Sequence, residues 1–196
     1  MPATAPAPPA DAPSENMQLS WLSKVQSPLQ DALAPGNWVG RFLSFNSDSK
    51  TWLFPNATPQ QASDAIVAVI KGLNSDQRAD LCVPCCQITK ATADHVHVRT
   101  WTKKEWLDVL DIKLSNGSVV NTVDGSKDSA PPAMAVAEAS FYATGMLPTS
   151  IPLAPIFNVA LFFFPFYSPG KDEMLQTLRL RVLEDLVRKN LASSAK

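Results

Sequence analysis

The alternation of apolar and polar residues predicts several short strands. Over residues 94–101, Val96 and Val98 alternate with His95 and His97, which is the two-residue period of a strand with one buried face. Strands are also predicted at 38–45, 50–54, 81–88, 112–114 and 119–123. The polar residues 46–49 and the Asn116-Gly117 pair predict hairpin turns between them.

Helices are predicted where apolar residues recur every three to four positions after a capping residue. Thr58, Pro59 and Gln61 form a capping box with proline at the first helical position. Thr102 and Glu105 form a second box, which predicts a short helix through residue 110. Further helices are predicted at 16–26, 28–35, 133–144 and from 169 to about 192. In the first of these, the face containing Met17, Trp21, Leu22 and Val25 is expected to pack over the core. The fourth begins after a capping Ser168, and the alanine-rich 133–144 helix is expected to stop at Gly145.

The most apolar stretch spans residues 155–167, with the sequence PIFNVALFFFPFY. We interpret it as a strand buried on both faces and bounded by Pro155 and Pro165, because proline cannot donate to a sheet ladder. The stretch is too short for a membrane-crossing helix, which needs about 20 apolar residues. A segment that contacts a partner or a membrane surface is the alternative.

The predicted carboxy-terminal helix carries two neighbouring apolar stripes. One stripe consists of Leu175, Leu178, Val182 and Leu186, and the other of Leu180, Leu183, Val187 and Leu191. Two stripes form a wider apolar face than a single contact surface requires. Either both pack internally, or the second stripe mediates oligomerisation. The basic residues Arg179, Arg181, Arg188 and Lys189 are expected on a solvated face.

These elements predict an α+β fold with antiparallel β-hairpins, interspersed helices, one buried hydrophobic strand and a long carboxy-terminal helix. Residues 1–15 are rich in proline and alanine and are predicted to be a disordered tail. Residues 16–192 are predicted to be a single globular domain, followed by a short tail at 193–196.

Composition narrows the functional classes. A net charge of -1 argues against nucleic-acid binding over the whole surface, and the first basic residue is Lys24, so the tail is no basic arm. A basic segment followed by an apolar run is lacking at the amino terminus, which predicts no secretory signal and an intracellular, cytoplasmic setting. The three cysteines are then expected to be reduced thiols.

All the cysteines and histidines lie between positions 82 and 97. One hypothesis is a tetrahedral zinc site formed by Cys82, Cys85, His95 and His97. Ordinary packing of small buried thiols and strand histidines is the simpler interpretation, which we favour. A cysteine nucleophile paired with a histidine is a third interpretation, although no orienting residue is recognisable.

A basic and aromatic segment follows these histidines. It contains Arg99, Trp101, Lys103 and Lys104, which are residue types that contact phosphates and stack on unpaired bases. Single-stranded nucleic acid is therefore a candidate ligand. The alternative places the tryptophan in the core and the lysines in solvent.

The sequence contains none of the common catalytic signatures, such as a glycine-rich phosphate loop, Gly-x-Ser-x-Gly or His-Glu-x-x-His. We therefore expect a non-enzymatic, self-assembling homo-oligomer without a required cofactor, such as a coat or matrix component of a virion. The alternative is a zinc-stabilised binding module that contacts single-stranded nucleic acid. A cysteine-dependent enzyme is the third hypothesis.

Overall fold

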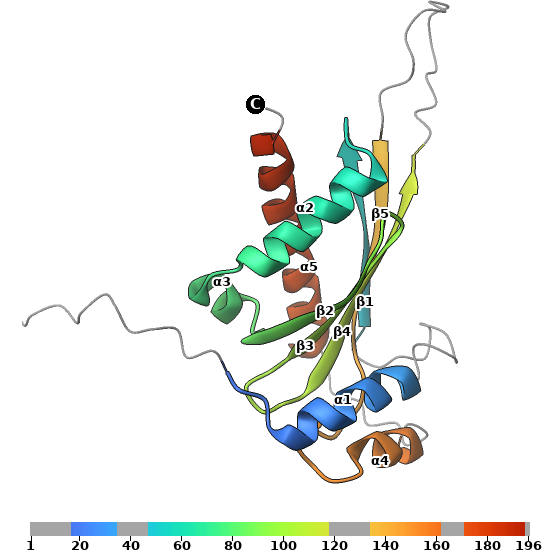
Figure 1. The fold of residues 1–196 in the computed structure, drawn as a ribbon, viewed down its shortest axis with the longest axis vertical. Coiled ribbons are helices and arrows are strands. Elements are labelled where there is room, and N and C mark those ends of the chain that lie inside the picture. Colours follow the sequence, from blue (N-terminus) through green and yellow to red (C-terminus); the bar gives the residue numbers. More distant parts are fainter. Residues whose placement is uncertain (1–16, 35–46, 118–133, 162–170, 195–196) are drawn as a thin grey trace, which may run out of the picture.

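The computed structural model describes residues 17–34, 47–117, 134–161 and 171–194, with side chains in the last range from 175 onward (Figure 1). Within these ranges the chain forms five strands and five helices, so the α+β class is confirmed. No described helix combines the length and the apolarity that crossing a membrane requires.

The strands form one antiparallel sheet in the order β1-β5-β4-β3-β2. Their bounds are Ser47–Pro55 for β1, Cys85–Ala91 for β2, His95–Trp101 for β3, Leu107–Asn116 for β4 and Met134–Ala143 for β5. Strands β2 to β5 follow one another as a meander, whereas β1 pairs with β5 at the opposite edge. The chain between β1 and β2 must therefore pass from one edge of the sheet to the other.

Two groups of helices lie on opposite faces of this sheet (Figure 1). The helices are α1 (Trp21–Leu33), α2 (Pro59–Gly72), α3 (Ser75–Asp80), α4 (Ala154–Leu161) and α5 (Lys171–Ser194). Helices α2 and α5 pack on each other and cover one face. Helix α1 lies against the other face, and α4 packs on α1. The short helix α3 was not predicted.

The main hydrophobic core lies between the sheet and helices α2 and α5. Alternate residues of each strand point into it, as the two-residue period requires. Its largest buried members are Trp52, Phe54, Ile66, Val96, Val98, Leu110, Ile112, Phe141 and Leu180. Each such side chain contributes roughly 1.5–3 kcal/mol relative to exposure, so this face supplies most of the apolar stabilisation.

The proposed oligomerisation stripe on the last helix belongs to this core. Leu180, Leu183 and Val187 are buried, and Leu191 packs against them while partly exposed. Leu180, Leu183 and Val187 thus pack internally against α2 and the sheet, which is the alternative that the sequence had left open. The long helix itself was predicted correctly, whereas its predicted cap at Ser168 lies outside the described residues.

Arg179, which was expected in solvent, is also buried in this core at 1% exposure. Its Nη1 donates to Asp108 Oδ2 at 2.8 Å, and its Nε donates to the Leu81 carbonyl at 2.7 Å. Nη2 donates to the Cys82 carbonyl, and the guanidinium carbon lies 4.8 Å from the centroid of the Phe141 ring. The other cations of that predicted face are exposed, namely Arg181, Arg188 and Lys189.

The predicted alanine-rich helix at 133–144 is instead strand β5. Ala135, Ala137 and Ala139 recur at every second position and are fully buried on the face covered by α2 and α5. Alanine favours helices, but here its small side chain allows two helices to approach the sheet. The two-residue spacing was therefore more informative than the composition.

The predicted buried strand at 155–167 is also wrong over its described part, which is helix α4. Ile156 and Phe157 are largely exposed, whereas Asn158 is buried and accepts hydrogen bonds from the backbone N–H groups of Met146 and Leu147. A Cβ at Gly145 would lie 2.3 Å from the Asn158 side chain, so this glycine permits the close approach. Residues 162–167 lie outside the described part. A short apolar run does not by itself distinguish a helix from a strand.

The two predicted capping boxes had different outcomes. At α2 the Thr58 hydroxyl accepts from the Gln61 N–H, and the Gln61 side chain accepts from the Thr58 N–H, as predicted. Residues 102–106 form the turn between β3 and β4 instead of a helix. Glu105 has a φ of 61°, and its carboxylate accepts hydrogen bonds from Ser20 and Ser23 at the start of α1.

Three boundaries also differ from the predictions. Residues 47–49, expected in a turn, are part of β1, which pairs with β5. Helix α1 continues through Pro28 as one element instead of two. Strand β2 begins at Cys85 and not at 81. The strands predicted at 38–45 and 119–123 lie outside the described residues.

Candidate functional site

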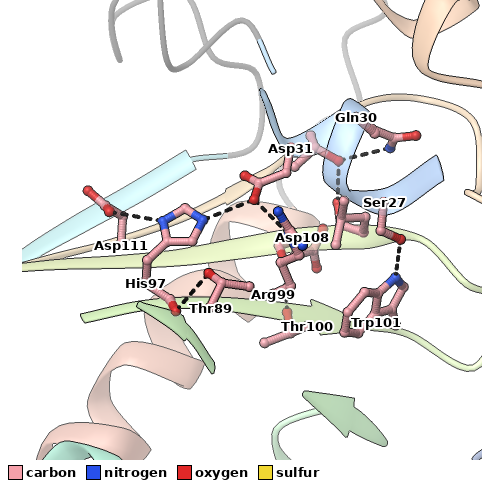
Figure 2. A network of polar contacts seen from close by, with 12 residues as sticks. Ser27, Gln30, Asp31, Thr89, His97, Arg99, Thr100, Trp101, Asp108 and Asp111 are labelled. Atoms are coloured by element: carbon pink, nitrogen blue, oxygen red, sulfur yellow. Dashed lines mark hydrogen bonds and ion pairs between the residues drawn. The ribbon is translucent and has the colours of Figure 1, made fainter. Parts of the chain in front are cut away.

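A cluster of charged and imidazole side chains lies on the sheet face opposite the main core. His95, His97 and Arg99 are alternate residues of β3, so all three point to this face. Asp111 of β4 is the direct partner of His97 in the sheet register. Asp31 approaches from α1, so three elements meet at one point (Figure 2).

His97 is the centre of this cluster because both of its ring nitrogens contact carboxylates. Nδ1 lies 3.2 Å from Asp111 Oδ1, and Nε2 lies 3.1 Å from Asp31 Oδ2 (Figure 2). The hydrogen bond to Asp111, followed by the one to Asp31, raises the pKa of His97 to about 9, although burial opposes this. At neutral pH His97 is therefore a cation that donates from both nitrogens.

The carboxylates of Asp111 and Asp31 remain ionised because the hydrogen bonds that they accept favour their charged form. Burial alone would raise the pKa of Asp111, but hydrogen bonds from His97 and His95 outweigh it and lower the pKa to about 2. Burial also opposes the ionisation of Asp31, and hydrogen bonds from His97 and Arg99 lower its pKa. Arg99 Nε donates to Asp31 Oδ2 at 2.7 Å. The cluster is thus an ion network of both signs.

His95 extends the cluster toward the sheet edge. Its Nε2 lies 2.5 Å from Asp111 Oδ1, and its Nδ1 lies 2.9 Å from Lys90 Nζ. The lysine ammonium can only donate, so Nδ1 accepts and Nε2 carries the proton given to Asp111. Ligand atoms of His95, His97 and Asp111 all lie within 4.8 Å of one another. Two imidazoles and a carboxylate at this spacing can surround one metal ion.

Helix α1 is held on the sheet by its polar face. Trp101 Nε1 donates to Ser27 Oγ at 3.0 Å, and Gln30 Nε2 donates to Thr144 Oγ1 at 2.9 Å. Gln26 donates to backbone carbonyls in the loop before α4. The expectation that the apolar face of this helix packs over the core is therefore wrong, because hydrogen-bonding residues take that place.

The outward side of α1 is consequently apolar. Trp21 is 74% exposed and Val25 66%, and Leu29 is also exposed one turn further on. Leu153, just before the neighbouring helix α4, and Ile156 and Phe157 in its first turn are exposed as well. We call these six residues the α1–α4 apolar surface. In the sequence this surface was visible only as apolar residues at helical spacing. Such spacing shows that the residues share one side of a helix, but not whether that side faces the sheet or the solvent.

The four predicted zinc ligands do not meet. Cys85 lies opposite Trp101 in the register, and Trp101 is four residues from His97 along β3, a separation of ~13 Å. Cys82 is exposed in the turn before β2. The structure therefore brings the two histidines together with Asp111 and leaves both cysteines apart from them. Sequence analysis did not identify Asp111 as a site residue. Its signal in the sequence was a carboxylate among the apolar residues of β4.

The thiols show no nucleophile pair with the histidines. Burial, followed by the neighbouring Cys86, raises the pKa of Cys85, which favours the protonated thiol. Cys86 itself is within 3.5 Å of Arg78 Nη1. A histidine base would have to lie within hydrogen-bond reach of a sulfur, and the described contacts of His95 and His97 are to carboxylates and Lys90.

The residues predicted to contact nucleic acid separate into two pairs. Arg99 is ion-paired with Asp31, and Trp101 is buried with its N–H donated to Ser27. Lys103 and Lys104 are exposed in the turn between β3 and β4. Base stacking on Trp101 would require the removal of α1, so only the two lysines remain accessible in this structure.

A scan against protein-family models and a search of curated proteins found no match to this chain.

Proposed function

We propose that this chain is a non-enzymatic structural protein that self-associates through the α1–α4 apolar surface. The observation that supports the proposal is the outward apolar side of α1. An amphipathic helix ordinarily turns such a side inward, because burial of apolar area is favourable. The exposed stripe therefore favours a partner that removes it from water.

A second copy of the chain is the partner that fits this surface. Trp21, Val25 and Leu29 are spaced four residues apart and form one row along α1. A two-fold axis can place such a row against its own copy, so that each apolar side chain meets another. Helix α4 contains no charged residue, and the net charge of -1 produces little repulsion between copies. A coat or matrix subunit of a virion is one class of protein with these requirements.

Hydrogen bonds on the inner side of α1 make the surface rigid enough for this role. Ser27, Gln30 and Gln26 hold the helix at three successive points, so its outer stripe has a defined orientation. Pre-organised surfaces lose less conformational entropy on association. The internal contacts of Arg99 and Trp101 weigh against nucleic acid as the main partner.

Analytical ultracentrifugation of the full-length chain over a wide concentration range tests the proposal. We expect a concentration-dependent dimer or larger species. The Trp21→Ser/Val25→Ser double variant should weaken association at least about tenfold, because it removes the two most exposed anchors. Leu178→Ser, at an exposed leucine on α5, is the matched control and should associate like the parent.

Two results would contradict self-association through this surface. The first is a parent protein that stays monomeric at the highest concentration. The second is a double variant that associates as tightly as the parent while its circular dichroism spectrum is unchanged.

A further inference from the structure

The His95, His97 and Asp111 cluster has the donor set and the rigidity of a metal centre. We propose that these three side chains bind one divalent transition-metal ion of the zinc class. Nδ1 of His97, Nε2 of His95 and a carboxylate oxygen of Asp111 are the ligand atoms. This site is independent of self-association through the α1–α4 apolar surface, which lies on the outer side of α1.

All three ligand residues lie on strands, so their placement does not depend on the conformation of a loop. His97 and Asp111 are directly paired across β3 and β4, and His95 is two residues from His97 on the same face. The Asp111 Oδ1 atom lies 2.5 Å from one imidazole nitrogen and 3.2 Å from the other. Donor atoms around a zinc ion at about 2.0–2.2 Å are roughly 3–3.5 Å apart, so modest side-chain rotations suffice.

The chemistry of the donors selects the class of ion. Imidazole nitrogen suits zinc, cobalt and nickel, whereas magnesium and calcium prefer oxygen ligands throughout. Three protein ligands leave at least one position for water or another ligand. The ion would replace the proton that His97 Nδ1 now donates to Asp111.

Asp31 supplies the outer support that metal-binding histidines usually have. Its Oδ2 accepts from His97 Nε2 at 3.1 Å, which leaves Nδ1 directed at Asp111. Such a carboxylate fixes the ring orientation and the tautomer of the ligand. Arg99 in turn holds the same Asp31 oxygen at 2.7 Å. Asp31 is thus a positioning residue and does not touch the ion.

Lys90 opposes binding and therefore offers a specific test. Its ammonium donates to Nδ1 of His95, whereas a His95 ring bound through Nε2 must carry its proton on Nδ1. Two donors would then face each other, so the exposed Lys90 side chain has to move away. Removal of Lys90 should tighten binding, an effect that a merely structural histidine network would not produce.

The experiment titrates the chelator-treated, full-length chain with Zn²⁺ against a chromophoric competitor, and with Co²⁺ by visible absorption. We expect one ion per chain and cobalt bands of low coordination number, without the near-ultraviolet band of thiolate ligands. His95→Gln and Asp111→Asn should each weaken zinc binding by at least about tenfold. Asp31→Asn should weaken it about 10- to 100-fold while the shape of the cobalt spectrum is kept.

Four further variants separate the site from its surroundings. Asp94→Asn removes a nearby exposed carboxylate and should leave binding unchanged, as should the Cys82→Ser/Cys85→Ser double variant. Lys90→Met should tighten binding several-fold, whereas Lys103→Met, at a remote exposed lysine, should not.

Failure to bind Zn²⁺ or Co²⁺ at stoichiometric levels would overturn the proposal. So would zinc binding that survives His95→Gln but is lost with the cysteines. Circular dichroism of each variant establishes that its fold is intact, and His95 is the least buried of the three ligands, which makes its variant the safest for folding.

Discussion

The two faces of the sheet are joined to their helices by opposite kinds of interaction. Helices α2 and α5 cover one face with aliphatic side chains, which pack on aliphatic and aromatic side chains of the strands. Helix α1 covers part of the other face with serine, glutamine and aspartate, and turns its apolar side outward. Apolar burial is strong but non-directional, whereas hydrogen bonds depend steeply on angle and distance. The first face thus supplies stability, and the second defines where α1 lies.

Each face nevertheless contains a buried ion network. On the apolar face Arg179 pairs with Asp108, and on the polar face His97 lies between Asp31 and Asp111. A guanidinium group does not titrate in the range in which proteins are studied, whereas an imidazole can lose its charge there. The two networks should therefore respond differently to mutation and to pH.

The largest effect is expected for Arg179→Met on the apolar face. This change leaves Asp108 and the Leu81 and Cys82 carbonyls without the hydrogen bonds that Arg179 donates. Removal of one partner of a buried ion pair costs about 3–5 kcal/mol in free energy of unfolding. Urea denaturation measures the loss, and Arg181→Met, exposed on the same helix, should change stability by less than about 0.5 kcal/mol. Equal small losses for both variants would contradict a structural role for Arg179.

The next effect concerns pH and the polar face. The folded-state pKa of His97, about 9, exceeds its ordinary value of 6.5, so its stabilisation is complete below pH 6.5 and is lost as the pH rises through 9. The loss is at most about 3.5 kcal/mol, because one pKa unit corresponds to about 1.4 kcal/mol, and solvent screening of the partly exposed ring reduces it.

Urea unfolding of the parent and of His97→Gln, in chelator, from neutral to alkaline pH measures this loss. The stability difference between the two proteins should shrink as the pH rises. A difference that stays constant over that range would show that the charge of His97 contributes nothing.

A third prediction tests how tightly the helices approach β5. Ala137→Leu inserts bulk beneath α2 and α5 and should cost about 1–3 kcal/mol, because an interior at native density resists overpacking. Glu138→Leu introduces the same side chain on the opposite, exposed side of the strand and should reduce the free energy of unfolding much less. Similar losses for the two variants would mean that β5 does not face the helices as described.

The smallest effect distinguishes the two sides of α1. Ser27→Ala leaves the buried Trp101 N–H without its acceptor and should cost about 1–2 kcal/mol. Trp21→Ser, measured at a concentration where the chain is monomeric, should change stability by less than about 0.5 kcal/mol. An ordinary amphipathic helix would show the reverse order, so thermal unfolding of both variants decides the orientation of α1.

Part of the fold was predictable because its signals are local. The capping box at Thr58 involves residues within one helical turn, and the alternation around Val96 and Val98 needs only a few positions. Another local pattern was misleading, since Thr102 and Glu105 also have capping-box spacing yet lie in a turn. There Glu105 instead accepts hydrogen bonds from Ser20 and Ser23, 85 and 82 residues away in sequence.

The candidate metal site shows the same limit. His95 and His97 were recognised because they are two residues apart on a predicted strand. Asp111 and Asp31 were not, because the first joins them through the register of β3 with β4 and the second through the docking of α1. The cysteines were chosen for their closeness in sequence, but β2 runs antiparallel to β3 and carries Cys85 away from the histidines.

By itself the sequence determined the α+β class, the capped start of α2, strand β3 and the long last helix, because each depends on contacts between near neighbours or on a regular period. Tertiary structure alone decided that the alanine-rich segment is a strand, that α1 faces the sheet with its polar side and that Asp111 meets the two histidines. These outcomes depend on which surfaces are already covered and on how strands are paired, and both are set by residues distant in the chain.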